Sequence, residues 1–274
     1  MKREFFATLE EVLFCDDYTQ KFAKFSDLYE DFCSDNVVFC HHHNVASLCS
    51  LFLPAPVLHP TRILRNKGTN SLSSMARILH SVAHIEYCAI TLALDSAYRF
   101  RNLPHLYYYD WLVVAREEFE HFTSLNALLN EIGFSYGDFP VHTGLYEAMI
   151  HTCENLEYRM GVVHRGLEAK GLDANPFVLA KFASCSHPIC GKVKEVFGTI
   201  LRDEIGHVSR GDKWWKFAVS KRTKQSGDFL ELCAQFREFN LAGKTLNVQA
   251  RLQCGFSIEE LQALGSFYEK RTSF

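Results

Sequence analysis

The chain has 274 residues, and the 47% that are hydrophobic suffice for one large globular domain or for a helical bundle with flanking extensions. The formal net charge of −3 does not indicate a general polyanion binder, although it leaves room for a local basic patch. Ten cysteines without a Cys-x-x-Cys pair or a regular framework favour reduced, mostly buried thiols. No segment has the apolar run of a signal peptide or a membrane span, so we expect a cytoplasmic protein with no membrane partner.

The first part of the chain shows helical spacing of apolar residues over 1–34 and an irregular, proline-containing stretch over 35–72. This pattern predicts a helical arm followed by a loop. Four longer segments with apolar stripes follow, and the short link between the first two indicates that they are antiparallel neighbours. We expect these helices at 73–100, 106–131, 144–170 and 189–218.

Two further amphipathic segments, 228–240 and 257–270, lie after the four long helices. We expect three regions: an arm and loop over 1–72, a four-helix bundle over 73–220, and a helical extension packed on it over 221–274. No strand pattern of comparable strength is present, so the predicted fold class is all-α.

Two Glu-x-x-His steps carry the chemical signal of this sequence. Glu118 and His121 form the first step, Glu204 and His207 the second, and a lone Glu86 lies on the apolar stripe of the preceding helix. Residues i and i+3 are neighbours on one helix face, so each step can aim a carboxylate and an imidazole at one point. Charged groups on apolar stripes are stable only if they are paired, and metal ions supply that pairing.

The third long helix offers two candidates for a further carboxylate. Glu157 and Glu168 are 11 residues apart, almost three turns of an ideal α-helix, so both fall on the same face. Helical periodicity therefore leaves the choice open.

The doubled step and the lone glutamate resemble the ligand set of the ferritin-like di-iron carboxylate superfamily, in which a Glu from each of two helices joins two Glu-x-x-His steps. The segments around His84 to Glu86, Leu167 to Asp173 and Asp203 to Val208 also resemble an uncharacterised bacterial ferritin-like family. The run Leu167 to Lys170 is similar to the third-helix ligand segment of the tRNA-modifying non-haem di-iron hydroxylase. That likeness favours Glu168 over Glu157.

The resemblance implies a four-helix bundle with two iron ions, or with manganese or a mixed iron and manganese pair, since the proposed ligands include no thiolate. It implies an O2-dependent oxidase or hydroxylase acting on a small molecule or a modified nucleoside with the help of an electron donor. A ferritin-type storage protein and a metal-free helical scaffold are the alternatives. A monomer or homodimer is expected of an enzyme, and a large cage of a storage protein.

Other polar residues have weaker interpretations. His84 and Asp203 are candidates for supporting the metal ligands, although a single histidine on an apolar helix is more often a packing residue. The Lys213 to Lys216 segment, with Lys221, Arg222 and Lys224, combines cations with two tryptophans and can bind single-stranded nucleic acid. Because cations are also favoured at a helix C-terminus, we do not favour a nucleic-acid partner.

Overall fold

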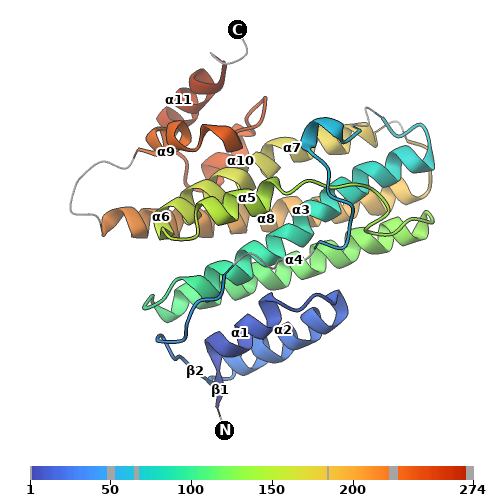
Figure 1. The fold of residues 1–274 in the computed structure, drawn as a ribbon. Coiled ribbons are helices and arrows are strands. Elements are labelled where there is room, and N and C mark those ends of the chain that lie inside the picture. The colour runs from blue at the N-terminus through green and yellow to red at the C-terminus, as the bar shows by residue number, and fades with distance from the viewer. Residues whose placement is uncertain (1, 48–52, 65–67, 184, 222–227, 270–274) are drawn as a thin grey trace. The chain divides into compact units, whose positions relative to one another are not determined.

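A computed structural model describes residues 2–47, 53–64, 68–183, 185–221 and 228–269 of the chain (Figure 1). Nearly all of its secondary structure is helical, so the all-α prediction is confirmed. The chain forms two compact units. Unit 1 comprises residues 1–64 and 79–143, and unit 2 comprises residues 65–78 and 144–274. The predicted arm, bundle and extension have boundaries at residues 72 and 220, which differ from the boundaries of these two units. That division stays a prediction.

Unit 1 contains two short helices, most of one long helix and all of another. They are α1 (Phe5–Leu13), α2 (Tyr18–Cys33), the part of α3 (Leu72–Arg99) from Leu79 onward, and α4 (His105–Glu131). The arm also has a small parallel pairing of β1 (Arg3–Glu4) with β2 (Val37–Val38), and a 3-10 turn follows at η2 (Pro60–Arg62). This two-residue ladder was too short to predict from the sequence.

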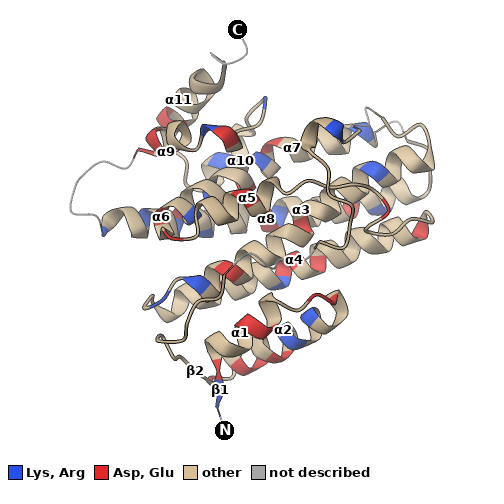
Figure 2. Cartoon of the chain, in the orientation of Figure 1, with Lys and Arg blue, Asp and Glu red and all other residues tan. Residues whose placement is uncertain are grey.

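Aromatic side chains pack the arm against α4. The rings of Phe25 and Phe119 lie 5.0 Å apart, and those of Tyr18 and Phe122 lie 4.6 Å apart. Asp17 starts α2 because its carboxylate accepts a hydrogen bond from the backbone N–H of Gln20 at 2.8 Å. Acidic and basic residues both occur on α2, whereas the charged residues of α1 are acidic (Figure 2).

Unit 2 is built on one long helix, α8 (Ile189–Ser220), with shorter segments around it. The segments before α8 are α5 (Gly144–His151), α6 (Leu156–Tyr158), η3 (Arg159–Leu167) and α7 (Glu168–Lys181). Those after α8 are α9 (Phe229–Gln235), η4 (Arg237–Phe239), α10 (Val248–Gln253) and α11 (Ile258–Glu269).

The prediction of one continuous helix over 144–170 was wrong, because polar side chains interrupt it. Asn155 accepts a hydrogen bond from the N–H of Tyr158 and so starts a new helix. The buried Arg159 guanidinium donates to the Thr152 hydroxyl at 2.9 Å and to the Met149 carbonyl at 2.7 Å, which satisfies the end of α5. The chain then continues as a π-helix over Arg159–Leu167 before α7 begins.

The prediction that this helix ends near residue 170 was also wrong, since α7 continues through Pro176 to Lys181. A proline inside a helix leaves the carbonyl four residues earlier without its usual partner. Here that carbonyl belongs to Leu172, and the Asn247 side-chain amide donates to it at 3.3 Å. The C-terminal segment therefore stabilises a helix that the local sequence would end.

Buried ion pairs hold the C-terminal segment in unit 2. Arg251 is fully buried and donates to both carboxylate oxygens of Asp173, at 2.9 and 2.7 Å. Arg165 of η3 bonds Asp212 on α8 and Glu260 on α11. Bidentate geometry of this kind makes a buried pair specific for one arrangement.

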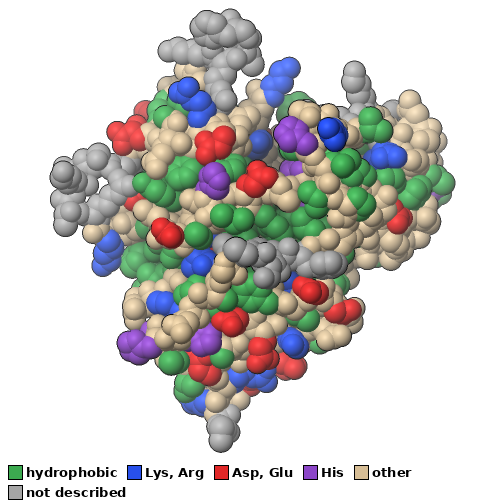
Figure 3. Space-filling model, in the orientation of Figure 1, with side chains coloured by type: hydrophobic (Ala, Val, Ile, Leu, Met, Phe, Trp, Pro, Cys, Tyr) green, Lys and Arg blue, Asp and Glu red, His purple; other side chains and the backbone are tan. Residues whose placement is uncertain are grey.

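Cys185 and Cys190 form a disulfide, so the expectation of reduced thiols was wrong at these two positions. Within the described ranges no helix has the length and apolar content needed to cross a membrane. Figure 3 shows acidic, basic and apolar side chains mixed over the visible face.

Candidate metal centre

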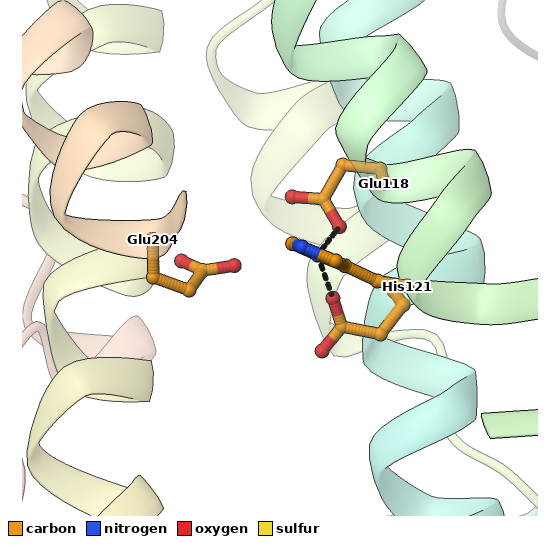
Figure 4. A group of neighbouring side chains, drawn as sticks. Glu118, His121 and Glu204 are labelled. Carbon is orange, nitrogen blue, oxygen red and sulfur yellow. Dashed lines mark hydrogen bonds and ion pairs between the residues drawn. The ribbon is translucent and has the colours of Figure 1, made fainter. Parts of the chain in front are cut away.

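Three buried ligands meet inside unit 1. Glu86 lies on α3, and Glu118 and His121 lie one turn apart on α4. The Nδ1 atom of His121 is 3.2 Å from Oε2 of Glu86 and 3.5 Å from Oε2 of Glu118. Figure 4 shows the Glu118 carboxylate and the His121 ring turned toward each other. We call these three residues the unit 1 triad.

The unit 1 triad is withdrawn from water, and its exposed fractions are 4% for Glu86, 0% for Glu118 and 2% for His121. One ligand atom of each residue lies within 4.8 Å of the others, so the group can hold a metal ion. A buried cluster of Glu and His suited to a metal is therefore confirmed, as the sequence predicted.

Electrostatics favour a cation in this position. Burial alone lowers the pKa of His121, but the hydrogen bonds and charges of Glu118 and Glu86 outweigh burial and raise that pKa to about 12. Without a metal, a proton on the imidazole supplies the positive charge between the carboxylates. A metal ion must displace that proton, so binding should release protons and weaken as the pH falls.

The second Glu-x-x-His step lies on α8 in unit 2. Nδ1 of His207 is 3.5 Å from Oε1 of Glu204, and the two residues are 1% and 7% exposed. The other carboxylate oxygen of Glu204, Oε2, is buried and has no hydrogen-bond partner among the described residues. A buried carboxylate oxygen needs a partner. A metal ion held together with the His207 imidazole would supply that partner.

The contacts between α8 and the segment over 159–181 show which glutamate lies beside this step. The two run antiparallel. A Cβ on Gly211 would lie 2.5 Å from the carbonyl carbon of His164, so the backbones touch there. Further along, Asn175 donates to the carbonyl of Phe197 at 3.3 Å.

Glu168 lies between these two contacts along its segment, so it lies opposite the turn of α8 that holds Glu204 and His207. Glu157, which is 7% exposed, lies near the other end of α8, since the neighbouring Gly161 faces Trp215. The premise that Glu157 and Glu168 share a helix face was wrong, because the intervening π-helix takes up nearly one more residue per turn than an α-helix.

His164 is a residue that sequence reasoning missed. It is 1% exposed, and its Nδ1 lies 3.9 Å from Oε1 of Glu168, which is four residues later in the chain. The i, i+4 spacing of His164 and Glu168 was visible in the sequence. This signal is weak, because a single histidine on an apolar helix is usually a packing residue.

His84 and Asp203 were expected to support the metal ligands. His84 bonds the Tyr136 hydroxyl at 2.9 Å and the His142 carbonyl at 2.8 Å, so its ring nitrogens face the loop after α4. Asp203 is partly exposed and lies 3.9 Å from Arg202. Support of the metal ligands by these two residues stays a prediction.

The aromatic residues of the suspected basic patch are buried. Trp214 is 3% exposed and Trp215 is 5% exposed, so neither ring is available for stacking on a base. Arg222 and Lys224 lie outside the described residues. The cations at 213, 216 and 221 therefore lack the aromatic platform that single-strand binding uses.

The family model described as "Protein of unknown function (DUF455)" matches residues 14–262. The chain belongs to this family. An uncharacterized protein from Haemophilus influenzae is 37% identical over 234 residues, which cover 80% of each chain. No solved structure matches. The functional argument for this member of the family therefore rests on its own residues.

Proposed function

We propose that the chain is an O2-dependent non-haem di-iron oxidase or hydroxylase, with manganese or a mixed iron and manganese pair as the other possible metals. The observation that carries the proposal is the unit 1 triad, in which two helices bring three buried ligand atoms within 4.8 Å of one another. Two carboxylates with an imidazole are the ligands that iron and manganese accept.

We assign six ligands to the two ions: Glu86, Glu118, His121, Glu168, Glu204 and His207. Glu204 and His207 are the second Glu-x-x-His step, on α8 of unit 2. Glu168 is supported by its position opposite the Glu204 to His207 turn, whereas Glu157 lies in α6, at the far end of η3 from that turn. His164, beside Glu168, is positioned to orient that carboxylate by hydrogen bonding.

The chain's own residues would bind the metals and keep bulk water away from them. A pair of Fe(II) ions, when bound, supplies two electrons for the reduction of O2. All of the assigned ligands except Glu168 are buried, so their charges interact more strongly than they would in water. His121 would release its extra proton on metal binding and then hold a neutral ring against the metal.

The metal-free scaffold remains the competing function, because one observation favours it. His121 in its protonated form already bridges Glu86 and Glu118, so unit 1 compensates part of its own buried charge. A scaffold of this kind would bind metals weakly and would not consume O2.

The test uses purified full-length protein loaded anaerobically with Fe(II) and then mixed with O2. We expect O2 uptake in proportion to bound iron and an absorption band that forms with it, both lost in His121→Ala and His207→Ala. Glu120→Gln is the matched control, since Glu120 is exposed on the same turn as His121. Equal O2 uptake by wild type and both histidine variants would refute the proposal.

The oligomer separates the enzyme from the storage protein. A monomer or homodimer in solution agrees with an enzyme. A large closed assembly that accumulates many iron ions per chain would instead indicate ferritin-type storage.

A further inference from the structure

Three sulfur-bearing side chains of unit 2 meet away from the carboxylate ligands. Sγ of Cys185 lies 3.7 Å from Sδ of Met75, and Cys185 is disulfide-bonded to Cys190. Met75 comes from the first turns of α3, Cys185 from the link between α7 and α8, and Cys190 from the start of α8. Met75 and Cys185 are 110 residues apart in the sequence, so the fold and not local spacing brings them together.

The sulfur distance between Cys185 and Met75 fits a trigonal metal site. Bonds of about 2.3 Å from a metal to three sulfurs place those sulfurs roughly 4 Å apart. The distance of 3.7 Å between Cys185 and Met75 is close to this value. The Cα atoms of Cys185 and Cys190 are 6.4 Å apart, so after reduction their thiolates can separate to the same spacing by side-chain rotation.

The surroundings of this cluster favour a soft ion. Met75 and Cys190 are 3% and 4% exposed, so bulk water does not compete for them. Thiolate and thioether together select Cu(I), whereas zinc is held by thiolates, imidazoles and carboxylates. A packing methionine would give the same contact but would contribute nothing to metal affinity, and this difference can be measured.

We propose that Cys185, Cys190 and Met75 form a Cu(I) site that is closed by the disulfide and opened by reduction. A thiol or phosphine reductant supplies two electrons, the S–S bond breaks, and two protons convert the sulfurs to thiols. Cu(I) then replaces both protons, which leaves a complex of two thiolates, one thioether and one Cu(I) with a charge of −1. This site is independent of the carboxylate ligands and of the function proposed for them.

The test is an anaerobic competition for Cu(I) against the chromophoric chelator bicinchoninate. Full-length protein is reduced with a phosphine, desalted without O2 and titrated in parallel with the oxidised form. The reduced wild type should withdraw one more equivalent of Cu(I) than the disulfide form. Cys190→Ser should lose that equivalent, and Met75→Leu should weaken it at least about tenfold.

Met149→Leu is the control, because Met149 is also a buried methionine of unit 2. Replacing it by leucine conserves side-chain volume in the same way but leaves the three sulfurs in place. The other cysteines also bind Cu(I), so only differences between matched variants count. X-ray absorption of the Cu(I)-loaded wild type should show three sulfur neighbours. Two sulfurs, or equal competition by wild type and Met75→Leu, would overturn the proposal, as would a Cys190→Ser protein that keeps the extra equivalent.

Discussion

Substitution of Glu168 by Gln, compared with the same substitution of Glu157, tests the ligand assignment in unit 2. Glutamine keeps the volume of the side chain and removes only its negative charge. Glu168 lies opposite the turn of Glu204 and His207 on α8. Glu157 lies eleven residues earlier, on the order of 15 Å along the helix axis.

The magnitude follows from these positions. A carboxylate oxygen binds a metal ion at about 2 Å. A separation on the order of 15 Å along the helix axis therefore keeps Glu157 out of reach of an ion held by Glu204 and His207. Loss of a supporting side chain typically weakens metal binding 10- to 100-fold, and loss of a direct ligand should cost at least the upper value. For Glu168→Gln we therefore expect affinity for one ion to fall about 100-fold or more, which is roughly 2.7 kcal/mol. Glu157→Gln should stay within about threefold of wild type.

The assay is titration calorimetry with Mn(II), which avoids oxidation during the measurement. Circular dichroism of both variants controls for unfolding. If Glu157→Gln loses the ion while Glu168→Gln retains it, Glu157 and not Glu168 lies beside the second Glu-x-x-His step, which would refute the assignment. If both variants bind as tightly as wild type, helix α7 supplies no ligand.

Three further predictions concern stability. Asp173→Asn should lower the free energy of unfolding by about 3–5 kcal/mol, because it leaves Arg251 buried without a carboxylate; in urea titrations, a loss below 1 kcal/mol would show that the pair is not needed. Gly211→Ala should destabilise unit 2, since the new Cβ would meet the His164 backbone, and a wild-type melting temperature would contradict that contact. Burial lowers the pKa of Lys21 to about 8, against the opposing charges of Cys15 and Asp16. Between pH 8 and 10.5 the unfolded chain keeps a proton that the native protein has lost, so stability should rise by up to about 3 kcal/mol. Lys21→Met should remove that rise, and an unchanged pH profile in this variant would refute the assignment.

Local sequence predicted the parts of the fold that depend on long apolar stripes. The helices α3, α4 and α8 begin and end within two residues of their expected bounds, because a continuous stripe and a short link determine each of them. The doubled Glu-x-x-His step was recognisable for the same reason, since i, i+3 spacing on a regular helix fixes which side chains share a face.

The rest depends on contacts between distant residues. Asn247 supports the carbonyl freed by Pro176, and Arg251 reaches Asp173 across 78 positions, so neither α7 nor the short α10 could be predicted from local pattern. The π-helix changed the register between Glu157 and Glu168, and no composition signal marks it. The disulfide likewise joins residues whose spacing matched no expected framework.

Metal stoichiometry of anaerobically reconstituted protein tests the central claim most directly. Full-length chain is saturated with Fe(II), freed of loose ions and analysed for iron per chain alongside His121→Ala and His207→Ala. We expect about two ions in wild type and about one in each variant, with helical content retained in all three. Fewer than one ion in wild type, or two ions in both variants, would contradict a di-metal centre held by these residues.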